Sequence, residues 1–518
     1  MTADPVVDDL DSSRAEVLDS FFLPQLTAPE LGGLTWVTRR VDGGGGAVLL
    51  RSPVLTPDVV ELVCDRLLAA QAAVLADRPV MDIAEVVGRA VARWYDPDHP
   101  GRRLAERLLP QITGYAPDMV RRGLKDHLKT FRADRLLRFL AADFDNPLVL
   151  DGFQPNRAGG RSRAFGPRLT TQVFAGNVPG LPAWNIICAL LVKSATLGKS
   201  ASGEPLFPVL LARSLAEEDP DLGRCLAVAP WPGGAADVEA AAFARSDAVT
   251  VTGGQAAVQS VTARVPTGVP VIAYGHKVSF AVVGREALAL NRYPDTARRV
   301  ARDVSQYDQQ GCLSPHVVFV ERDGGVDPQT FSAALAGEMA RFEVTRPRAR
   351  LGLADSAAIE QVRAQYEFRS YDDAAGVALF ASDGTTAWTV VHEERPAAFT
   401  LSPLNRVVRV HPVSDVAELE PLLAPVRRYL QTAGVACAPE RLTGWAEVLG
   451  RCGVDRICAV GQMPDPAAGW HHDGRGSLAA LVRWVDIEGA AELTMESYDP
   501  EWTRPGAASG TRNGREGL

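Results

Sequence analysis

The sequence predicts an α/β protein in which a Rossmann-type parallel sheet is followed by a second α/β region. Three observations support this fold class. Residues 57–145 have helical periodicity, short apolar runs alternate with amphipathic stretches from 169 to 275, and strand-like apolar runs resume from residue 278. Strands that alternate with helices at this spacing form right-handed βαβ units, which build parallel sheets.

Length and composition limit the classes of protein that the chain can belong to. Its 518 residues exceed one ordinary core, so several domains are expected. The net charge of −9 argues against a nucleic-acid scaffold, because phosphate binding draws on clustered Lys and Arg. The acidic start (1–13) lacks the apolar core of a signal peptide, and no apolar run reaches membrane-spanning length. We therefore expect no membrane span and a cytoplasmic location.

The mainly helical N-terminal region is assigned to residues 1–164. Segments 58–77, 82–95 and 132–144 carry apolar residues at i, i+3 and i+4, the pattern of amphipathic helices. A Gly-, Pro- and Arg-rich stretch then marks a boundary.

A dinucleotide-binding domain of the Rossmann type is predicted over residues 165–273. Strands are expected at 169–176, 195–201, 225–231, 248–254 and 270–275. Helices are expected at 181–194, 205–219, 237–246 and 255–265. In such sheets ligands bind at the carboxyl ends of the strands.

The remainder is predicted as a second α/β domain over residues 274–440, a C-terminal α/β segment over 441–498 and a tail over 499–518. The second domain contains strand-like runs at 278–284, 316–321, 387–393 and 406–412. The tail is rich in Gly, Arg and Ser and is predicted to be disordered.

Seven cysteines form no CxxC pair, so neither a metal site nor a disulfide framework is predicted. One of them, Cys312, lies in "SQYDQQGCLSPH" (305–316), after glutamines and a glycine. A buried packing role is common for cysteine, so the surroundings must decide whether Cys312 is catalytic.

Other candidate residues stand at the ends of predicted strands. Lys199 lies in a GKS sequence that lacks the first glycine of a phosphate loop, so an ATP-type site is excluded. Gly253 and Gly254 would let backbone N–H groups approach a pyrophosphate. Asn177 could donate to an oxyanion or form an Asx-turn. The segment "GWHHDG" (469–474) favours a turn with two exposed imidazoles over a metal site.

The order of these features resembles the acyl-CoA reductase family of the aldehyde dehydrogenase superfamily, which includes the long-chain fatty acyl reductases of bacterial bioluminescence. Residues 176–208, 307–321 and 453–484 carry the resemblance. It implies an aldehyde-dehydrogenase-like fold, with Cys312 as the nucleophile and Asn177 as the oxyanion donor.

The same resemblance assigns the coenzyme residues. Lys199 and Ser202 would lie at the adenosine ribose, and Gly253 and Gly254 at the pyrophosphate. NAD-preferring relatives carry a glutamate where this chain has Ser202, so NADPH is expected, and NADH is the alternative.

The sequence departs from the superfamily pattern at two places. "AYGHK" places Ala273 where oxidative members have the glutamate that activates a deacylating water, so a thioester on Cys312 should persist. His276 in this stretch is expected to be either a proton donor or a wall residue. The segment that grips the nicotinamide ribose becomes "FTLSP" (399–403).

The resemblance therefore implies an NADPH-dependent enzyme that reduces an acyl thioester to an aldehyde through a Cys312 acyl-enzyme. Acyl-CoA, an acyl carrier or an acyl-enzyme partner protein would deliver the acyl group, and a homo-oligomer is expected. An oxidative aldehyde dehydrogenase and a catalytically inactive acyl-binding subunit are the alternatives.

Overall fold

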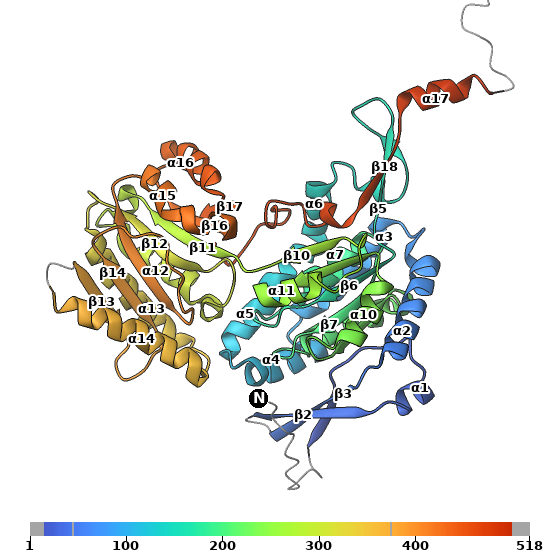
Figure 1. Cartoon of the computed structure of the whole chain (residues 1–518), viewed down its shortest axis with the longest axis horizontal. Helices are drawn as coiled ribbons and strands as arrows, with labels where there is room; N and C mark the ends of the chain where they lie inside the picture. The colour runs from blue at the N-terminus through green and yellow to red at the C-terminus, as the bar shows by residue number, and fades with distance from the viewer. Residues whose placement is uncertain (1–14, 44–45, 373–375, 500–518) are drawn as a thin grey trace, which may run out of the picture.

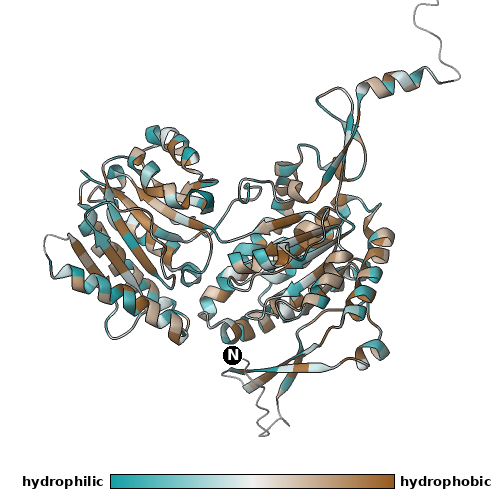
Figure 2. Ribbon diagram, viewed as in Figure 1, coloured by the Kyte–Doolittle hydropathy of each residue, from teal (hydrophilic) through white to brown (hydrophobic). Residues whose placement is uncertain are grey.

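A computed structural model describes residues 15–43, 46–372 and 376–499, which are built around two large sheets (Figure 1). The predicted α/β class is confirmed, because both sheets are mainly parallel and covered by helices. Hydrophobic strands form the centre of each sheet (Figure 2). The acidic residues 1–13 and the predicted disordered tail from residue 500 onward lie outside the described residues. Among the described helices, none is both long and apolar enough to cross a membrane.

The first sheet has five parallel strands in the order β10-β9-β6-β7-β8, and they match the five predicted strands. The strands are β6 (Leu169–Val173), β7 (Ala195–Ser200), β8 (Leu226–Pro230), β9 (Ala248–Thr252) and β10 (Val271–Tyr274). The predicted connecting helices are confirmed as α7 (Pro182–Leu191), α8 (Phe207–Glu218), α10 (Ala236–Ala244) and α11 (Gln255–Thr262), with a short α9 (Pro220–Gly223) after α8. Because β6 has β7 on one side and β9 on the other, the strand order reverses at β6, where such sheets bind ligands.

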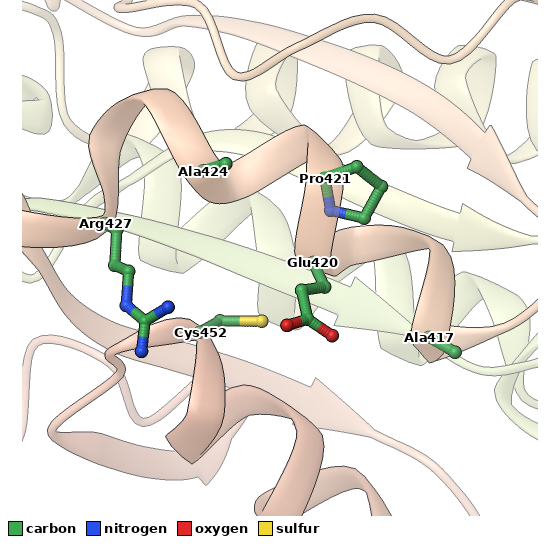
Figure 3. Close-up of a pocket in the computed structure, with 6 residues that line it drawn as sticks. All are labelled: Ala417, Glu420, Pro421, Ala424, Arg427 and Cys452. Carbon is green, nitrogen blue, oxygen red and sulfur yellow. The ribbon is translucent and has the colours of Figure 1, made fainter.

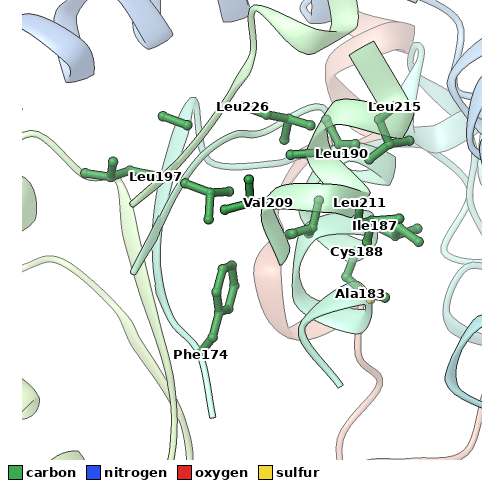
Figure 4. Packing of buried hydrophobic residues seen from close by; sticks show 14 of the residues in the cluster. Phe174, Ala183, Ile187, Cys188, Leu190, Leu197, Val209, Leu211, Leu215 and Leu226 are labelled. Carbon is green, nitrogen blue, oxygen red and sulfur yellow. The ribbon is translucent and has the colours of Figure 1, made fainter. Parts of the chain in front are cut away.

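Side chains of α7 and α8 pack tightly on this sheet (Figure 4). Leu197 of β7 and Ile187 of α7 are buried in the same cluster, consistent with a strand covered on both faces. Gly198 meets the ring of Phe174, and an added Cβ would lie only 2.5 Å from a ring carbon. A glycine is therefore required at this point of close approach.

The second sheet has seven strands in the order β13-β14-β15-β12-β11-β16-β17, and only the β13–β14 pair is antiparallel. Its strands are β11 (Val278–Val283), β12 (Pro315–Glu321), β13 (Val377–Ala381), β14 (Thr389–Glu393), β15 (Val407–Val413), β16 (Leu430–Ala436) and β17 (Arg456–Ala459). Alternate side chains of β11 face two separate cores. The covering helices are α12 (Tyr293–Ser305), α13 (Pro328–Thr345), α14 (Leu353–Ser370), α15 (Leu419–Leu423) and α16 (Pro439–Cys452).

The N-terminal helices share their core with the five-stranded sheet, so they do not form a separate hydrophobic unit. They are α2 (Pro57–Ala70), α3 (Val80–Tyr95), α4 (Pro100–Thr113), α5 (Pro117–Leu128) and α6 (Ala133–Asp143). Before them lie α1 (Ala28–Gly32) and a three-stranded sheet of β1 (Glu16–Asp19), β3 (Gly46–Pro53) and β2 (Trp36–Gly43).

The chain between 441 and 498 contributes to two different parts of the fold. Most of α16 and all of β17 belong to the seven-stranded unit. Strand β18 (Arg483–Ile487) instead pairs with β5 (Arg161–Phe165), which pairs with β4 (Gln154–Pro155). With α17 (Gly489–Glu496), this small sheet forms an arm that projects from the body (Figure 1).

Candidate active site

Cys312 lies in the loop that leads into β12, after the 3₁₀ turn η6 (Gln306–Gln309). It is partly exposed, whereas Cys64, Cys188 and Cys225 are buried. The Cys312 carbonyl accepts a 2.7 Å hydrogen bond from the Ser279 hydroxyl of β11. The starts of β11 and β12 therefore meet at the thiol, and β11 begins only a few residues after β10 ends.

The backbone before Cys312 adopts a conformation that side chains disfavour. Tyr307, Asp308 and Gln309 have φ values of 52°, 50° and 65°. A second such triplet faces it: Leu404, Asn405 and Arg406 have φ values of 62°, 56° and 66°. Such residues cost on the order of 1–3 kcal/mol each and persist only where the surroundings impose them.

A buried ion pair and the glutamines join these two triplets. Arg406 is fully buried, and its Nη2 lies 2.6 Å from Oδ1 of Asp308. The Gln309 side chain donates to the Val407 carbonyl at 2.9 Å and accepts from the Val407 N–H at 3.0 Å, as a neighbouring strand would. Gln310 donates to Oδ1 of Asn405 at 2.9 Å. These polar residues therefore hold the Cys312 loop in shape.

Asn177 follows β6 and contacts the same loop. Its Nδ2 donates to the Gln310 carbonyl at 2.8 Å, and its own carbonyl accepts a hydrogen bond from the Tyr115 hydroxyl at 2.7 Å. The Tyr115 hydroxyl also lies 3.2 Å from the Tyr307 carbonyl. The end of the first sheet and the cysteine loop are thus brought together, as the sequence predicts.

The thiol lies in an unfavourable environment for a thiolate. Burial and, to a smaller extent, the nearby Asp473 carboxylate together raise the pKa of Cys312 to about 11, against a lowering side-chain hydrogen bond from Gln431. Gln431 at the start of β16 donates to Asp473 at 2.6 Å. The Lys277 ammonium is 3.9 Å from Asp473 and 3.7 Å from Asp455. At neutral pH the Cys312 thiol is therefore protonated.

The loop at 469–474 also reaches this site through Asp473, and the sequence analysis did not predict this contact. His471 is exposed as predicted, but the prediction is wrong for His472. The His472 ring stacks on Tyr274 at 4.3 Å and lies 4.7 Å from the Trp470 ring. Burial lowers the pKa of His472 to about 4, so its imidazole is neutral. In the sequence, only the neighbouring Trp470 indicated that His472 would pack against other aromatic rings. In the described part of the chain, no cluster of three or more His, Cys, Asp or Glu could hold a metal ion.

His276 is exposed at the start of β11, with its ring 6.3 Å from that of Tyr429. A second histidine, His316, was not singled out from the sequence. Its Nδ1 accepts from the Ser402 N–H at 3.1 Å, so its Nε2 carries the proton when the ring is neutral. Burial lowers the pKa of His316 to about 4, and His276 contributes in the same direction. Ser402 and Phe399, whose ring lies 6.1 Å from His316, belong to the "FTLSP" segment, which therefore packs against His316 at the start of β12.

The predicted coenzyme residues lie at the carboxyl edge of the five-stranded sheet. Lys199 is at the end of β7, with its ammonium 5.8 Å from the centre of the Trp231 ring, and burial lowers its pKa. Ser202 beyond it is exposed. Gly253 and Gly254 follow β9, and an added Cβ on Gly254 would meet nothing within 4 Å. Open backbone, a partly buried cation and a helix N-terminus at one sheet edge suit a dinucleotide.

Two cavities lie elsewhere. One of about 310 Å³ is lined by Glu420, Arg427 and Cys452 between α15 and α16 (Figure 3). Another cavity, of about 870 Å³, is lined by residues that include Cys437 and Cys458, beside β16 and β17. Neither includes a predicted site residue.

Comparisons with known proteins bear on this arrangement. Residues 75–484 match the family model described as acyl-CoA reductase (LuxC). The long-chain acyl-protein thioester reductase of Vibrio harveyi is 24% identical over 435 residues, which cover 82% of this chain and 86% of that protein. The protein of the same name from Aliivibrio fischeri is 26% identical over 419 residues, covering 79% and 82%.

Solved structures agree on the fold. NADP-dependent glyceraldehyde-3-phosphate dehydrogenase from Bacillus halodurans, in complex with NADP, has a TM-score of 0.66 at 14% identity, covering 88% of this chain and 95% of its own. A putative methylmalonate-semialdehyde dehydrogenase from Sinorhizobium meliloti, in complex with NAD, has a TM-score of 0.67 at 14% identity, covering 92% and 98%. The aldehyde-dehydrogenase-like fold is confirmed.

Proposed function

The chain belongs to the acyl-CoA reductase (LuxC) family, and from this premise we propose that it reduces a long-chain acyl thioester to the aldehyde through an acyl group carried on Cys312. One observation carries the assignment of the site. The 2.8 Å hydrogen bond from the Asn177 side chain to Gln310 joins the end of β6 to the cysteine loop. The proposed oxyanion donor and the proposed nucleophile, far apart in sequence, therefore act at one place.

In the first step the Cys312 thiol loses its proton to solvent, and the resulting thiolate attacks the acyl carbonyl and displaces the carrier thiolate. The second N–H of the Asn177 amide and the backbone N–H of Cys312 would donate to the oxyanion that forms. We assign the exposed His276 as the donor of the proton that the leaving thiolate takes up, since its ring can exchange protons with solvent. A thiol replaces a thiol, so no redox change occurs at this stage.

The acyl-enzyme must outlast competing hydrolysis. Ala273 occupies the place at which the superfamily's oxidative members carry a basic glutamate, and a methyl group cannot deprotonate water. This favours the reductive direction over the oxidative alternative, and the full set of Cys312, Asn177 and Lys199 argues against an inactive subunit.

The reductant is proposed to be NADPH, held by Lys199, Ser202, Gly253 and Gly254. When bound, the reduced nicotinamide supplies the hydride that converts the acyl group to an aldehyde. The choice of NADPH over NADH is supported by Ser202, an exposed hydroxyl in place of a carboxylate. Glu204, two residues further on, is buried and accepts hydrogen bonds from the N–H groups of Leu206 and Phe207, at 2.9 and 2.8 Å. Its carboxylate therefore caps α8 and does not face the ribose.

The names of the relatives describe acyl-protein substrates. We propose that an acylated carrier or partner enzyme supplies this chain as well, with acyl-CoA as the small-molecule equivalent. A homo-oligomer is also proposed, supported by exposed apolar side chains on the arm, Leu493 at 70% and Tyr498 at 74% exposure.

The experiment is to incubate the full chain with a long-chain acyl-CoA and no coenzyme. Peptide mass spectrometry should locate the acyl group on Cys312, and added NADPH should remove it with release of aldehyde. Cys437→Ala, which alters another partly exposed thiol, should behave like the wild type, whereas Cys312→Ala should form no adduct. Rapid aldehyde oxidation with NADP⁺ and no reduction of acyl-CoA would instead favour the oxidative enzyme. Absence of both activities would favour the acyl-binding subunit.

A further inference from the structure

Arg39 reaches the proposed coenzyme site from the N-terminal sheet, far away in the sequence. It lies on β2, and its Nη1 donates to the Ser202 carbonyl at 2.5 Å. The N-terminal segment is attached to the five-stranded sheet at its edge strand β8. Phe22 and Val228 of β8 exchange two backbone hydrogen bonds of 2.7 Å, so the position of Arg39 is set by the fold.

The charge of Arg39 is available for a ligand. In the parts of the chain that the structure describes, no carboxylate lies within ion-pair distance of it. The Arg39 charge acts on Glu204, whose pKa is raised to about 7 by burial, against lowering hydrogen bonds from the backbone and a lowering contribution from Arg39. Because the Glu204 carboxylate is buried at the start of α8, the surface around Ser202 presents cations and a hydroxyl.

Strand alternation separates Arg39 from its neighbour. Side chains on β2 alternate between faces, and Arg39 shares a face with Val41, which is only 5% exposed and belongs to the core. Arg40 points to the other face, where its Nε lies 2.8 Å from Asp42. Arg39 thus reaches the Ser202 carbonyl, whereas Arg40 pairs with Asp42.

We propose that Arg39 is a specificity residue that binds the 2′-phosphate of NADPH together with Lys199 and Ser202. This inference rests on the proposed coenzyme site. A guanidinium presents a planar pair of N–H groups that matches two phosphate oxygens, and the ribose hydroxyl of NADH offers it no comparable anion. The hydrogen bond from Arg39 to the Ser202 carbonyl would hold the guanidinium next to the Ser202 hydroxyl. The other N–H groups of Arg39 would remain for the phosphate.

The test measures binding of NADPH, NADH, 2′-AMP and 5′-AMP to the full chain by calorimetry. Arg39→Ala should weaken the binding of NADPH and of 2′-AMP by about tenfold to a hundredfold, which is the usual effect of losing one charged hydrogen bond. Its affinities for NADH and 5′-AMP should change less than twofold. Arg39→Lys should recover part of the loss, because it keeps the charge without the planar pair. Arg40→Ala is the matched control and should leave all four affinities unchanged.

The outcomes separate this inference from the coenzyme proposal beneath it. A wild type that binds 2′-AMP no better than 5′-AMP would overturn the NADPH assignment itself. In the other case the wild type binds 2′-AMP more tightly than 5′-AMP, as the coenzyme proposal requires. If Arg39→Ala then keeps this preference, or loses affinity for both ligands equally, only the role of Arg39 is overturned. Thermal melting of each variant checks that the N-terminal sheet stays folded.

Discussion

At the scale of single residues, Cys312 and Asp473 set the reactivity of the site. The pKa of Cys312 is raised to about 11, mainly by burial, so only the small thiolate fraction is reactive near pH 7. The thiolate fraction rises with pH below that pKa. Alkylation of Cys312 by iodoacetamide should therefore accelerate about tenfold per pH unit between pH 7 and 9, followed by peptide mass spectrometry. A plateau below pH 8 would contradict the raised pKa.

Asp473→Asn should speed that alkylation at pH 7.5. The substitution removes the negative charge that raises the Cys312 pKa, while the amide oxygen can still accept from Gln431. About 1 kcal/mol of electrostatic relief corresponds to roughly a fivefold increase. Asp134→Asn on exposed α6 is the control, since its carboxylate pairs with Arg132 at the surface. Equal rates in the wild type and Asp473→Asn would remove Asp473 from this role.

Asn177→Ala separates oxyanion stabilisation from loop tethering. Loss of one oxyanion donor typically costs on the order of 10²–10³ in turnover, so acylation by acyl-CoA should fall by that factor. Iodoacetamide forms no oxyanion, so its reaction with Cys312 should be nearly unchanged. An equal fall in both reactions would mean that Asn177 only holds the Gln310 carbonyl in place.

At the scale of elements, the two left-handed triplets form a brace around the loop that carries Cys312. Asp308→Asn should leave the buried Arg406 with Glu343 as its remaining carboxylate partner. Breaking a buried pair commonly costs about 3–5 kcal/mol, and we expect the lower end because that second partner remains. Urea unfolding should show the loss, and hydrogen exchange should increase over residues 306–314.

The matched control for the brace is Asp295→Asn on α12. Asp295 pairs with Arg299 at 2.6 Å, but their side chains are 40% and 55% exposed. Solvent-exposed pairs contribute about 0–1 kcal/mol, so this variant should remain close to wild-type stability. Similar stability of Asp308→Asn and Asp295→Asn would show that the triplets are held by the glutamine hydrogen bonds alone.

At the scale of the whole molecule, Tyr115 joins three parts of the fold. It lies between α4 and α5, and its hydroxyl contacts the carbonyls of Asn177 and Tyr307. Tyr115→Phe should cost about 1 kcal/mol, because the single hydroxyl proton is shared between the two carbonyls. Because small displacements of reacting groups can slow chemistry by about a hundredfold, acylation of Cys312 should fall by more than stability alone explains.

Tyr95→Phe provides the comparison, measured by single-turnover acylation and by urea unfolding. The Tyr95 hydroxyl donates to the Lys125 carbonyl at 2.8 Å within the helical region, away from the site. It should lose similar stability without the extra loss of rate. A Tyr115→Phe variant that acylates Cys312 at the wild-type rate would show that the junction does not position the site.

The sequence by itself determined the parallel α/β order, the family and the candidate chemistry, because strand–helix alternation and short motifs are local patterns. Lys199, Gly253 and Gly254 could be placed at one sheet edge for the same reason: parallel strands bring their carboxyl ends together. Cys312 was identified as the candidate nucleophile by the order of several short motifs, which resembles that of the acyl-CoA reductase family.

Only the tertiary structure decided which distant side chains act on that motif. The Asp308–Arg406 pair, the packing of His472 on Tyr274 and the contact of Arg39 with Ser202 join residues far apart in the chain, and no local period encodes such contacts. The membership of the N-terminal helices in the core of the first sheet is likewise a matter of burial between elements. Local propensity specifies elements, whereas burial and charge pairing across the folded chain specify the site.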